Sequence, residues 1–237
     1  MVQFTNLRKG PLVSLALIAV LAIVAVGGMT SLAGRAGSPA LKTSIPDPGF
    51  DSPRASAPAK ETMVVAGGCF WGVQAVFEQV KGVISATSGY AGGKLPADYE
   101  MVSTGQTGHA ESVKVVYDPS RISYGQLLKI FFSVAHDPTQ LNQQGPDTGT
   151  QYRSAIFYTD ATQQKIAKAY IEQLGAAKVF RRKIVTEVTP LSMFYDAEAY
   201  HQDYFFHHPL QPYIVINDKP KVEALKQQFP DLFVEHK

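Results

Sequence analysis

The sequence predicts an α+β domain in two layers, a mixed β-sheet with helices packed on it. Between residues 62 and 229, short β-rich segments are interspersed with segments whose apolar residues recur at helical spacing. The sequence lacks the long βαβ series and the glycine-rich phosphate loop of a doubly wound nucleotide-binding fold. With 237 residues, the chain has room for one domain and additional segments.

Composition narrows the classes of function. Hydrophobic residues make up 45% of the chain and charged residues 18%, as is usual for a globular protein. The formal net charge is only +2, and no basic stripe with interleaved aromatic residues occurs, so we expect no nucleic-acid partner. The single cysteine, Cys69, excludes an intramolecular disulfide and a cysteine-rich zinc site.

The first 33 residues have the pattern of a signal peptide or a membrane anchor. Arg8 and Lys9 precede an uncharged apolar run over residues 12–26, and Ser31-Leu32-Ala33 offers the small residues of a cleavage site. The run is short for a full transmembrane helix, which needs about 20 residues. A cleaved signal and an uncleaved anchor are therefore both open. Either one predicts an exported protein, periplasmic or anchored in the membrane and facing the periplasm.

A linker is predicted to follow the apolar segment. Residues 34–60 are rich in proline, alanine, serine and glycine and have no apolar period. We therefore expect the folded domain to span residues 61–237.

The elements of the amino-terminal half follow from local patterns. Residues 62–66 are apolar and β-branched, typical of a buried strand, and residues 83–90 and 110–117 predict two more strands. A short helix is expected to begin at Asp98 and to carry Tyr99 in its first turn. A longer helix is expected after the first strand, because four apolar residues recur there at i, i+3, i+4 and i+7: Val73, Val76, Phe77 and Val80.

The stretch Gly67–Gly72, with sequence GGCFWG, joins the first strand to this helix and holds Cys69. The unpaired N–H groups and the dipole at a helix amino terminus favour an anion, and a cysteine there can have a lowered pKa. The alternative is that Cys69 is a small buried core residue. Phe70 and Trp71 could equally belong to the core or to a pocket wall.

Glu111 is the unusual residue of the 110–117 strand. It shares one face with Val113, Val115 and Tyr117, and this apolar face is expected to be buried. A carboxylate at that position either reaches solvent at the end of the strand or lines a cavity with a raised pKa. The pattern alone favours the solvated side chain, because carboxylates are seldom fully buried without a partner.

The carboxy-terminal half continues with the same mixture of elements. Ser123 and Gln126 form a capping box that begins a helix with four inward apolar residues: Leu127, Leu128, Phe131 and Val134. A polar loop over residues 139–150 is long enough to be functional. The remaining elements are strands over 152–158 and 183–188, a helix capped by Asp160 and Gln163, an irregular segment over 190–200, and a terminal helix from Pro220.

Residues 200–208 form a dense aromatic–histidine cluster that includes His201, His207 and His208. Adjacent His207 and His208 point in different directions, and no second ligand cluster accompanies them. We therefore favour ring nitrogens bonded to buried polar groups over a metal site, and we expect no metal.

Several ordered blocks of sequence resemble the A-type peptide methionine sulfoxide reductases. The blocks are Gly68–Gly72 (GCFWG), Gly105–Glu111 (GQTGHAE), His136–Thr139 (HDPT), Gly149–Ser154 (GTQYRS) and Tyr200–Tyr204 (YHQDY). Together they cover most of the predicted domain. The resemblance implies a ferredoxin-like core and reduction of the S epimer of methionine sulfoxide, free or in proteins, which repairs proteins after oxidative stress.

The resemblance also implies roles for individual residues. Cys69 would be the nucleophile, and its sulfur would become a sulfenic acid when methionine is released. Glu111 would be the acid that protonates the sulfoxide oxygen, kept neutral by an apolar pocket. Tyr99 and Tyr152 would donate hydrogen bonds to that oxygen, and Asp147 would have a supporting role.

Phe70 and Trp71 would form the apolar slot for the methyl group of the substrate. No cofactor is implied.

The chain departs from many members of this family because it has no second cysteine to attack the sulfenic acid. Ser103 stands where some relatives carry a cysteine, and the tail after Asn217 has no thiol. We therefore expect an external thiol reductant, either a thioredoxin- or glutaredoxin-like protein or a small thiol. The protein is expected to be a monomer.

Two other classes of function are open at this point. A cysteine hydrolase would pair Cys69 with His109 or His201 and would need an oxyanion hole. A tethered binding domain would not depend on Cys69 at all.

Overall fold

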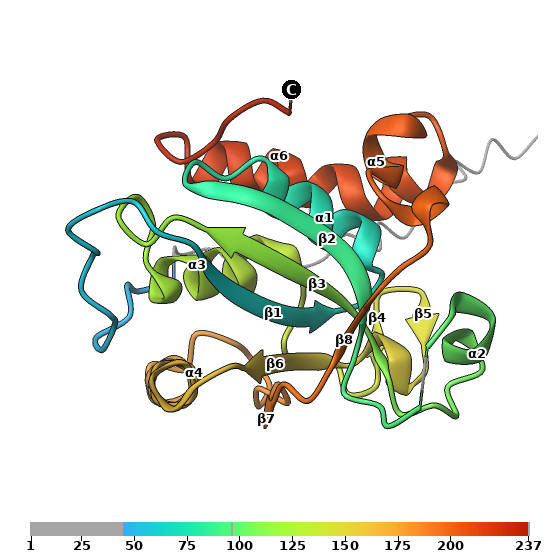
Figure 1. The fold of residues 1–237 in the computed structure, drawn as a ribbon, viewed down its shortest axis with the longest axis horizontal. Helices are drawn as coiled ribbons and strands as arrows, with labels where there is room; N and C mark the ends of the chain where they lie inside the picture. Colours follow the sequence, from blue (N-terminus) through green and yellow to red (C-terminus); the bar gives the residue numbers. More distant parts are fainter. Residues whose placement is uncertain (1–44, 96, 237) are drawn as a thin grey trace, which may run out of the picture. The chain divides into compact units, whose positions relative to one another are not determined.

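The computed structural model describes residues 45–95 and 97–236. Six strands form one sheet in the order β7-β6-β1-β3-β2-β8 (Figure 1). The strands are β1 (Glu61–Gly67), β2 (Val83–Ala91), β3 (Ala110–Tyr117), β6 (Ser154–Tyr158), β7 (Glu187–Pro190) and β8 (Phe194–Asp196). All neighbouring strands are antiparallel except β6 and β7. A separate two-stranded ribbon pairs β4 (Gln143–Gln144) with β5 (Asp147–Thr148).

The helices are short, and several are continued or preceded by π- or 3₁₀-turns. The α-helices are α1 (Phe70–Glu78), α2 (Tyr99–Ser103), α3 (Tyr124–Ile130), α4 (Ala161–Ala176), α5 (Tyr204–His207) and α6 (Lys219–Gln228). A π-helix over Phe131–Ala135 continues α3, and another over Ile214–Asp218 leads into α6. Thr150–Tyr152 and Ala199–His201 are 3₁₀-helices.

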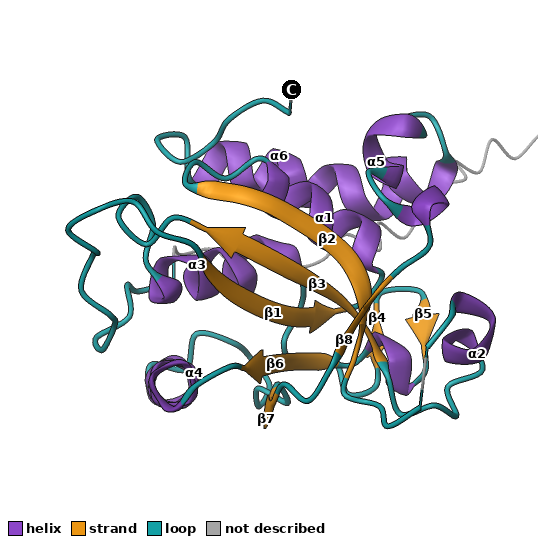
Figure 2. Ribbon diagram, in the orientation of Figure 1, coloured by secondary structure: helices purple, strands orange, loops and turns teal. Residues whose placement is uncertain are grey.

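The central part of the chain has ferredoxin-like topology. In sequence it runs β1-α1-β2-β3-α3-β6, and in space the four strands are ordered β6-β1-β3-β2. Helices α1 and α6 lie together over one face of the sheet, and α4 lies beside β6 and β7 at one edge (Figure 2). The predicted α+β fold, a mixed sheet with helices packed on it, is therefore confirmed.

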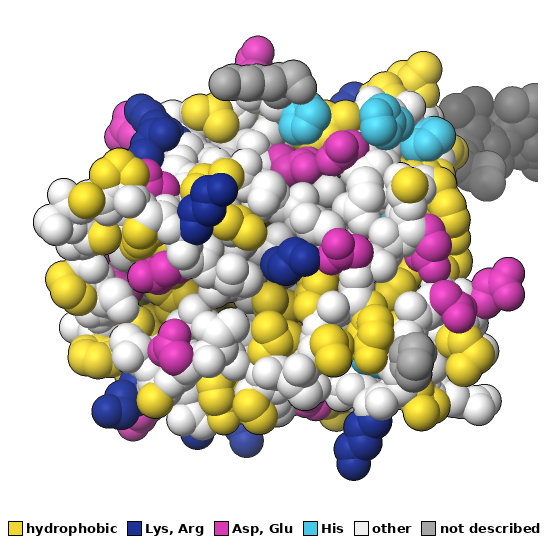
Figure 3. Space-filling model, viewed as in Figure 1, with side chains coloured by type: hydrophobic (Ala, Val, Ile, Leu, Met, Phe, Trp, Pro, Cys, Tyr) yellow, Lys and Arg dark blue, Asp and Glu magenta, His cyan; other side chains and the backbone are white. Residues whose placement is uncertain are grey.

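The alternation in β3 separates two apolar layers. Glu111, Val113, Val115 and Tyr117 are buried, and the last three belong to the main core beneath the helices. The opposite face of the sheet carries a smaller apolar cluster of six residues: Val64, Ala66, Ala91, Ala110, Ala155 and Phe157. On the outer surface, Figure 3 shows basic and acidic side chains interspersed, with no continuous basic stripe on the face in view.

Residues 45–60 differ from the linker expected for this segment, because they pack against the domain. Ile45 is 2% exposed and belongs to the core. The Tyr170 hydroxyl donates to the Pro46 carbonyl, and Asp51 accepts hydrogen bonds from the Ser123 hydroxyl and the Gly125 N–H. The segment is held by isolated polar contacts, which leave no periodic pattern of apolar residues in its sequence. Its composition therefore predicted a linker.

The two edge strands also differ from expectation. The strand predicted over residues 183–188 lies at Glu187–Pro190, and residues 190–200, expected to be irregular, contain β8. Both strands are at most four residues long and form by pairing with β6 and β2, which are distant in sequence. No described helix combines the length and apolarity needed to cross a membrane. The predicted anchor at 12–26, the rest of the 1–33 segment and residues 34–44 of the predicted linker lie outside the described residues.

Candidate active site

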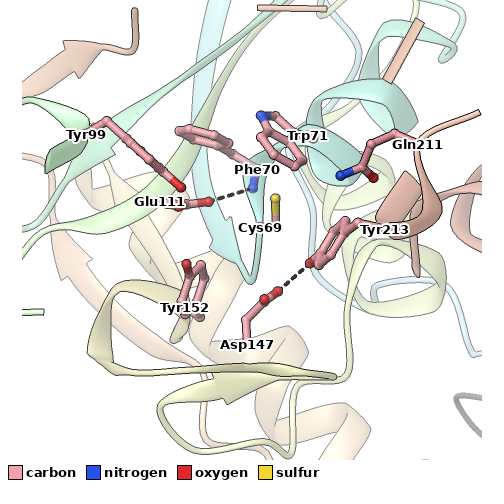
Figure 4. A pocket seen from close by; sticks show the side chains of 9 residues that line it. All are labelled: Cys69, Phe70, Trp71, Tyr99, Glu111, Asp147, Tyr152, Gln211 and Tyr213. Atoms are coloured by element: carbon pink, nitrogen blue, oxygen red, sulfur yellow. Dashed lines mark hydrogen bonds between the residues drawn. The ribbon is translucent and has the colours of Figure 1, made fainter. Parts of the chain in front are cut away.

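A cavity of about 240 Å³ opens at the amino end of α1 (Figure 4). Nine residues line it: Cys69, Phe70, Trp71, Tyr99, Glu111, Asp147, Tyr152, Gln211 and Tyr213. The structure thus brings together all seven site residues predicted from the sequence. Gln211 and Tyr213 were missed, because neither lies in a recognisable motif or belongs to an unusual local pattern.

The backbone turn between β1 and α1 determines the position of Cys69. Gly68 has a φ of +85°, and a Cβ atom there would lie 2.5 Å from Cβ of Gln144. Only glycine adopts this conformation readily and leaves that space. Cys69 is the N-cap residue of α1, and its side chain makes no capping hydrogen bond.

Burial controls the protonation of Cys69. The residue is 8% exposed, and desolvation raises the pKa of its thiol well above the usual value. Ionisation of Glu111 and Asp218 at the higher pH where the thiol titrates raises this pKa further, whereas the Trp71 N–H and Lys221 lower it. The lowered thiol pKa expected at a helix amino terminus is therefore wrong for the resting protein, which holds a neutral thiol.

Glu111 lies on the buried face of β3 and faces the same cavity as Cys69. It is 4% exposed, and its Oε2 accepts a hydrogen bond from the Phe70 backbone N–H at 3.1 Å. Burial raises the pKa of its carboxyl to about 8; the Phe70 hydrogen bond lowers it, and the charges of Asp147 and Asp218 raise it. The solvated side chain favoured by pattern is therefore wrong, and Glu111 is a neutral carboxylic acid at pH 7.

Tyr99 and Tyr152 enter the cavity from different elements, α2 and the 3₁₀-helix at 150–152. Their hydroxyl groups point to the region around Glu111 (Figure 4). Burial, and then the charge of Glu111, raises the pKa of both hydroxyls, so both are available as neutral hydrogen-bond donors. Glu198 fixes the start of α2, because its carboxylate accepts from the Tyr99 N–H and the Tyr90 hydroxyl, each at 2.8 Å.

Asp147 and Tyr213 form the opposite side of the cavity. The Tyr213 hydroxyl donates a hydrogen bond to the Asp147 carboxylate (Figure 4). Burial raises the pKa of Asp147, whereas this hydrogen bond and the charge of Lys221 lower it. The pair connects the 137–149 loop region to the segment that precedes α6.

Aromatic packing determines the orientation of Trp71. Its ring stacks on Tyr204 with centroids 3.8 Å apart, and it meets the ring of Tyr213 edge-on at 5.9 Å. Its Nε1–H donates to Nδ1 of His201 at 3.1 Å. Phe70 is fully buried beside it. The two side chains therefore form an apolar wall of fixed shape.

Some residues of the predicted motif blocks support the site without lining it. Arg153 is 9% exposed and donates to the carbonyls of Thr150 and Gly108, which joins the GTQYRS and GQTGHAE blocks. His136 accepts from or donates to the Ser154 hydroxyl at 2.7 Å, and burial lowers the pKa of its ring to about 4. His136 is therefore a neutral structural residue.

The hydrolase alternative is wrong for this site. His109 uses Nδ1 to accept from the Gly93 N–H and Nε2 to contact the Leu95 carbonyl, so it has no nitrogen for Cys69. His201 binds Trp71, and neither histidine lines the cavity. The contact of His201 Nδ1 with Trp71 matches the structural role favoured for the histidine cluster, but His207 and His208 are exposed and do not fit it.

Comparison with known proteins agrees with this geometry. The family described as peptide methionine sulfoxide reductase matches residues 61–232. The peptide methionine sulfoxide reductase MsrA 2 of Mesorhizobium japonicum is 60% identical over 181 residues, covering 76% of this chain and 93% of the relative. The peptide methionine sulfoxide reductase MsrA 2 of Synechocystis is 52% identical over 190 residues, covering 79% of this chain and 89% of the relative.

Solved structures show the same fold. Methionine sulfoxide reductase A of Corynebacterium diphtheriae aligns with a TM-score of 0.56 and 39% identity, covering 66% of this chain and 78% of that chain. Mxr1 from Saccharomyces cerevisiae in reduced form aligns with a TM-score of 0.57 and 35% identity, covering 64% of this chain and 87% of that chain. The chain therefore belongs to the peptide methionine sulfoxide reductase family, and it is an A-type enzyme that reduces the S epimer of methionine sulfoxide and repairs oxidised proteins.

Proposed function

We propose that the reduction takes place in the cavity at the amino end of α1 and that Cys69 is its nucleophile. The observation that carries the proposal is that a reachable thiol and a neutral carboxyl group line one cavity. The Cys69 sulfur attacks the sulfoxide sulfur, which gains two electrons and leaves as the thioether of methionine. The sulfur–oxygen bond of the substrate breaks, and the oxygen ends on Cys69 as a sulfenic acid, R–SH + R′₂SO → R–SOH + R′₂S.

Glu111 is the general acid in this proposal. Its carboxyl donates a proton to the sulfoxide oxygen, which is a poor leaving group without one, and recovers a proton from the Cys69 thiol. Tyr99 and Tyr152 donate hydrogen bonds to the same oxygen as negative charge develops on it. The neutral state of all three groups at pH 7 supports this assignment.

The remaining lining residues bind and orient the substrate. Phe70 and Trp71 hold the methyl group in an apolar slot, which gives the two substituents of the sulfur different environments and so discriminates between epimers. Asp147, held by Tyr213, supports the polar side of the cavity.

An external thiol restores Cys69, because these 237 residues contain no second cysteine. The first thiol displaces water from the sulfenic acid to form a mixed disulfide, and a second thiol releases Cys69 and an external disulfide. A thioredoxin- or glutaredoxin-like protein or a small thiol can supply both equivalents. The reaction as written needs no metal or cofactor.

A single-turnover experiment tests this route. Enzyme that has been reduced and then freed of reductant should convert one equivalent of S sulfoxide per chain, and a dimedone-type probe should then label Cys69. Enzyme alkylated with iodoacetamide gives the baseline, and the R epimer serves as the substrate control. Stoichiometric methionine without labelled Cys69 would count against the sulfenic acid. Adding dithiothreitol, a thioredoxin system or a glutathione–glutaredoxin system afterwards identifies which reductant restores turnover.

We further propose that the chain is exported and acts as a monomer in the periplasm, free or anchored by residues 12–26. The charged start, apolar run and small residues of the 1–33 segment support this location. Fractionation of the source cells should place the protein in the periplasmic or membrane fraction, with a cleaved amino terminus if the signal is removed. Intact chain in the cytosolic fraction alone would contradict export.

A further inference from the structure

A second cavity, of about 370 Å³, lies at the carboxyl end of α4 and is larger than the cavity that holds Cys69. It is formed by the last turns of α4 and by the segment that connects α4 to β7. Eight residues line it: Ile171, Leu174, Gly175, Lys178, Phe180, Arg182, Lys183 and Ile184. A volume of this size is typical of pockets that hold a small ligand.

The side chains around this cavity are of two kinds. Four are apolar, one of them buried and the others half-buried against the main core: Leu174, Ile171, Phe180 and Ile184. The charged ones are all exposed cations: Lys178, Arg182 and Lys183. Arg182 lies 3.6 Å from Asp137, whereas neither lysine has an ionic partner among the described residues. A ligand that matches both kinds of side chain carries a negative charge next to an apolar part.

Positive charge is concentrated in this part of the chain. Residues 161–183 contain six lysine and arginine residues, all exposed, and one acidic residue, Glu172, which gives them a net charge of +5. The whole chain has a formal net charge of +2, so all other residues together carry −3. A local excess of one sign attracts surfaces of the opposite sign, even on a protein of low net charge.

The first described residues contact the same turns of α4. The Tyr170 hydroxyl donates to the Pro46 carbonyl at 2.7 Å. The Gln173 side chain donates to the Asp47 carbonyl and accepts from the Gly49 N–H, each at 2.8 Å. These turns also supply two of the apolar residues that line the cavity. The amino-terminal segment is therefore joined to the domain at the helix that borders the cavity.

This connection limits how far the domain can be from a membrane that holds the proposed anchor at 12–26. The 18 residues from 27 to 44 can span at most about 65 Å when fully extended. Tethering at such a length gives a weak lipid site on the domain a high effective concentration of membrane surface. Modest affinity is then enough for the domain to rest on the bilayer.

We propose that the cavity at the carboxyl end of α4 and its exposed cations bind an anionic phospholipid, so that this face of the domain lies on the membrane surface. The lysine and arginine side chains bind the phosphate group, and the apolar side chains contact the glycerol and acyl part of the lipid. A free phosphate would use only the cations. In Figure 1, α4 lies at one end of the domain, whereas α2 and β5, which border the cavity of Cys69, lie at the other. A domain bound in this way keeps the Cys69 cavity open to substrates. The inference does not depend on the chemistry of Cys69.

Hydrogen exchange of the full chain tests the inference. The chain is incorporated into vesicles of phosphatidylcholine alone and into vesicles in which about one quarter of the lipid is phosphatidylglycerol. Backbone amides of residues 174–184 should exchange several-fold more slowly in the anionic vesicles, because bound lipid suppresses local opening. Raising the NaCl concentration from about 50 mM to about 500 mM should remove the difference, because exposed charges are then screened.

The test variant is Lys178→Gln/Arg182→Gln/Lys183→Gln. Each lysine or arginine near an anionic surface strengthens binding about fivefold, so this variant should bind about 100-fold more weakly and lose the slow exchange. The control, Lys81→Gln/Lys219→Gln/Lys226→Gln, removes the same charge from exposed lysines after α1 and on α6 and should keep it. Circular dichroism checks that both variants are folded.

Three results would overturn the inference. Equal exchange in the two kinds of vesicle would mean that the cations are merely solvated. Slow exchange with inorganic phosphate alone, without vesicles, would indicate a site for a free anion. Slow exchange that is the same in detergent as in anionic vesicles would indicate that protein covers the cavity, either a second copy or the segment before residue 45. Sulfoxide reduction, which should be equal in the wild type and both variants, tests the proposed function separately.

Discussion

Alanine at position 111 is expected to slow reduction of the S sulfoxide by about 100- to 10,000-fold, the usual contribution of a positioned general acid. The wild-type carboxyl is protonated at neutral pH, because burial raises its pKa to about 8. Alanine supplies no proton and also leaves the Phe70 N–H without its partner at the edge of the cavity. The sulfoxide oxygen would then leave only with the help of the two tyrosine hydroxyls and water.

Glutamine at the same position separates proton transfer from hydrogen bonding. Its amide oxygen can accept from the Phe70 N–H and its NH₂ group can donate to the sulfoxide oxygen, but it transfers no proton. Glu111→Gln should therefore retain partial activity, between the wild type and Glu111→Ala. The wild type, Glu111→Gln and Glu111→Ala are compared by their single-turnover rates with a peptide that contains the S sulfoxide. Glu61→Ala, a change to an exposed carboxylate of β1, is the control and should keep the wild-type rate. Full turnover by Glu111→Ala would exclude Glu111 as the acid.

The placement of Cys69 and Glu111 shows what local sequence can predict. Two glycines after a β-rich segment and an apolar period behind them were enough to place Cys69 at the start of α1. Alternation alone placed Glu111 on the buried face of β3. Both conclusions depend on neighbours within a few residues, where backbone geometry fixes the direction of the side chain.

What the sequence missed depends on contacts between distant segments. Tyr213 reaches Asp147, 66 positions earlier, and Lys221 reaches the helix that begins at residue 70. Neither contact leaves a period or motif in its own segment. The protonation of Cys69 was also misjudged for this reason. The helix amino terminus is visible in the sequence, but the burial and the two carboxyl groups that outweigh it are contributed by other elements.

The raised pKa of Glu111 makes the stability of the domain depend on pH in a defined direction. The carboxyl of an unfolded chain has a pKa near 4.5, and that of the folded protein is about 8. Between these values the folded state binds the extra proton, so its stability falls as pH rises. The contribution of protonated Glu111 to the stability of the folded state is fully present below pH 4.5 and is lost once the pH exceeds about 8. The difference between the two pKa values corresponds to a decrease in the free energy of unfolding on the order of 5 kcal/mol.

Glu111→Gln removes this dependence because an amide does not titrate. The free energy of unfolding, measured by urea at pH 5, 7 and 9, should fall more steeply with pH in the wild-type sequence than in Glu111→Gln. Both proteins should carry Cys69→Ser, so that the thiol does not titrate in the same range. From pH 5 to pH 9, the difference in the free energy of unfolding between the two proteins should change by several kcal/mol in favour of the glutamine variant. Parallel curves would mean that Glu111 ionises in the folded state as it does in water, and the neutral acid on which the reaction depends would be absent.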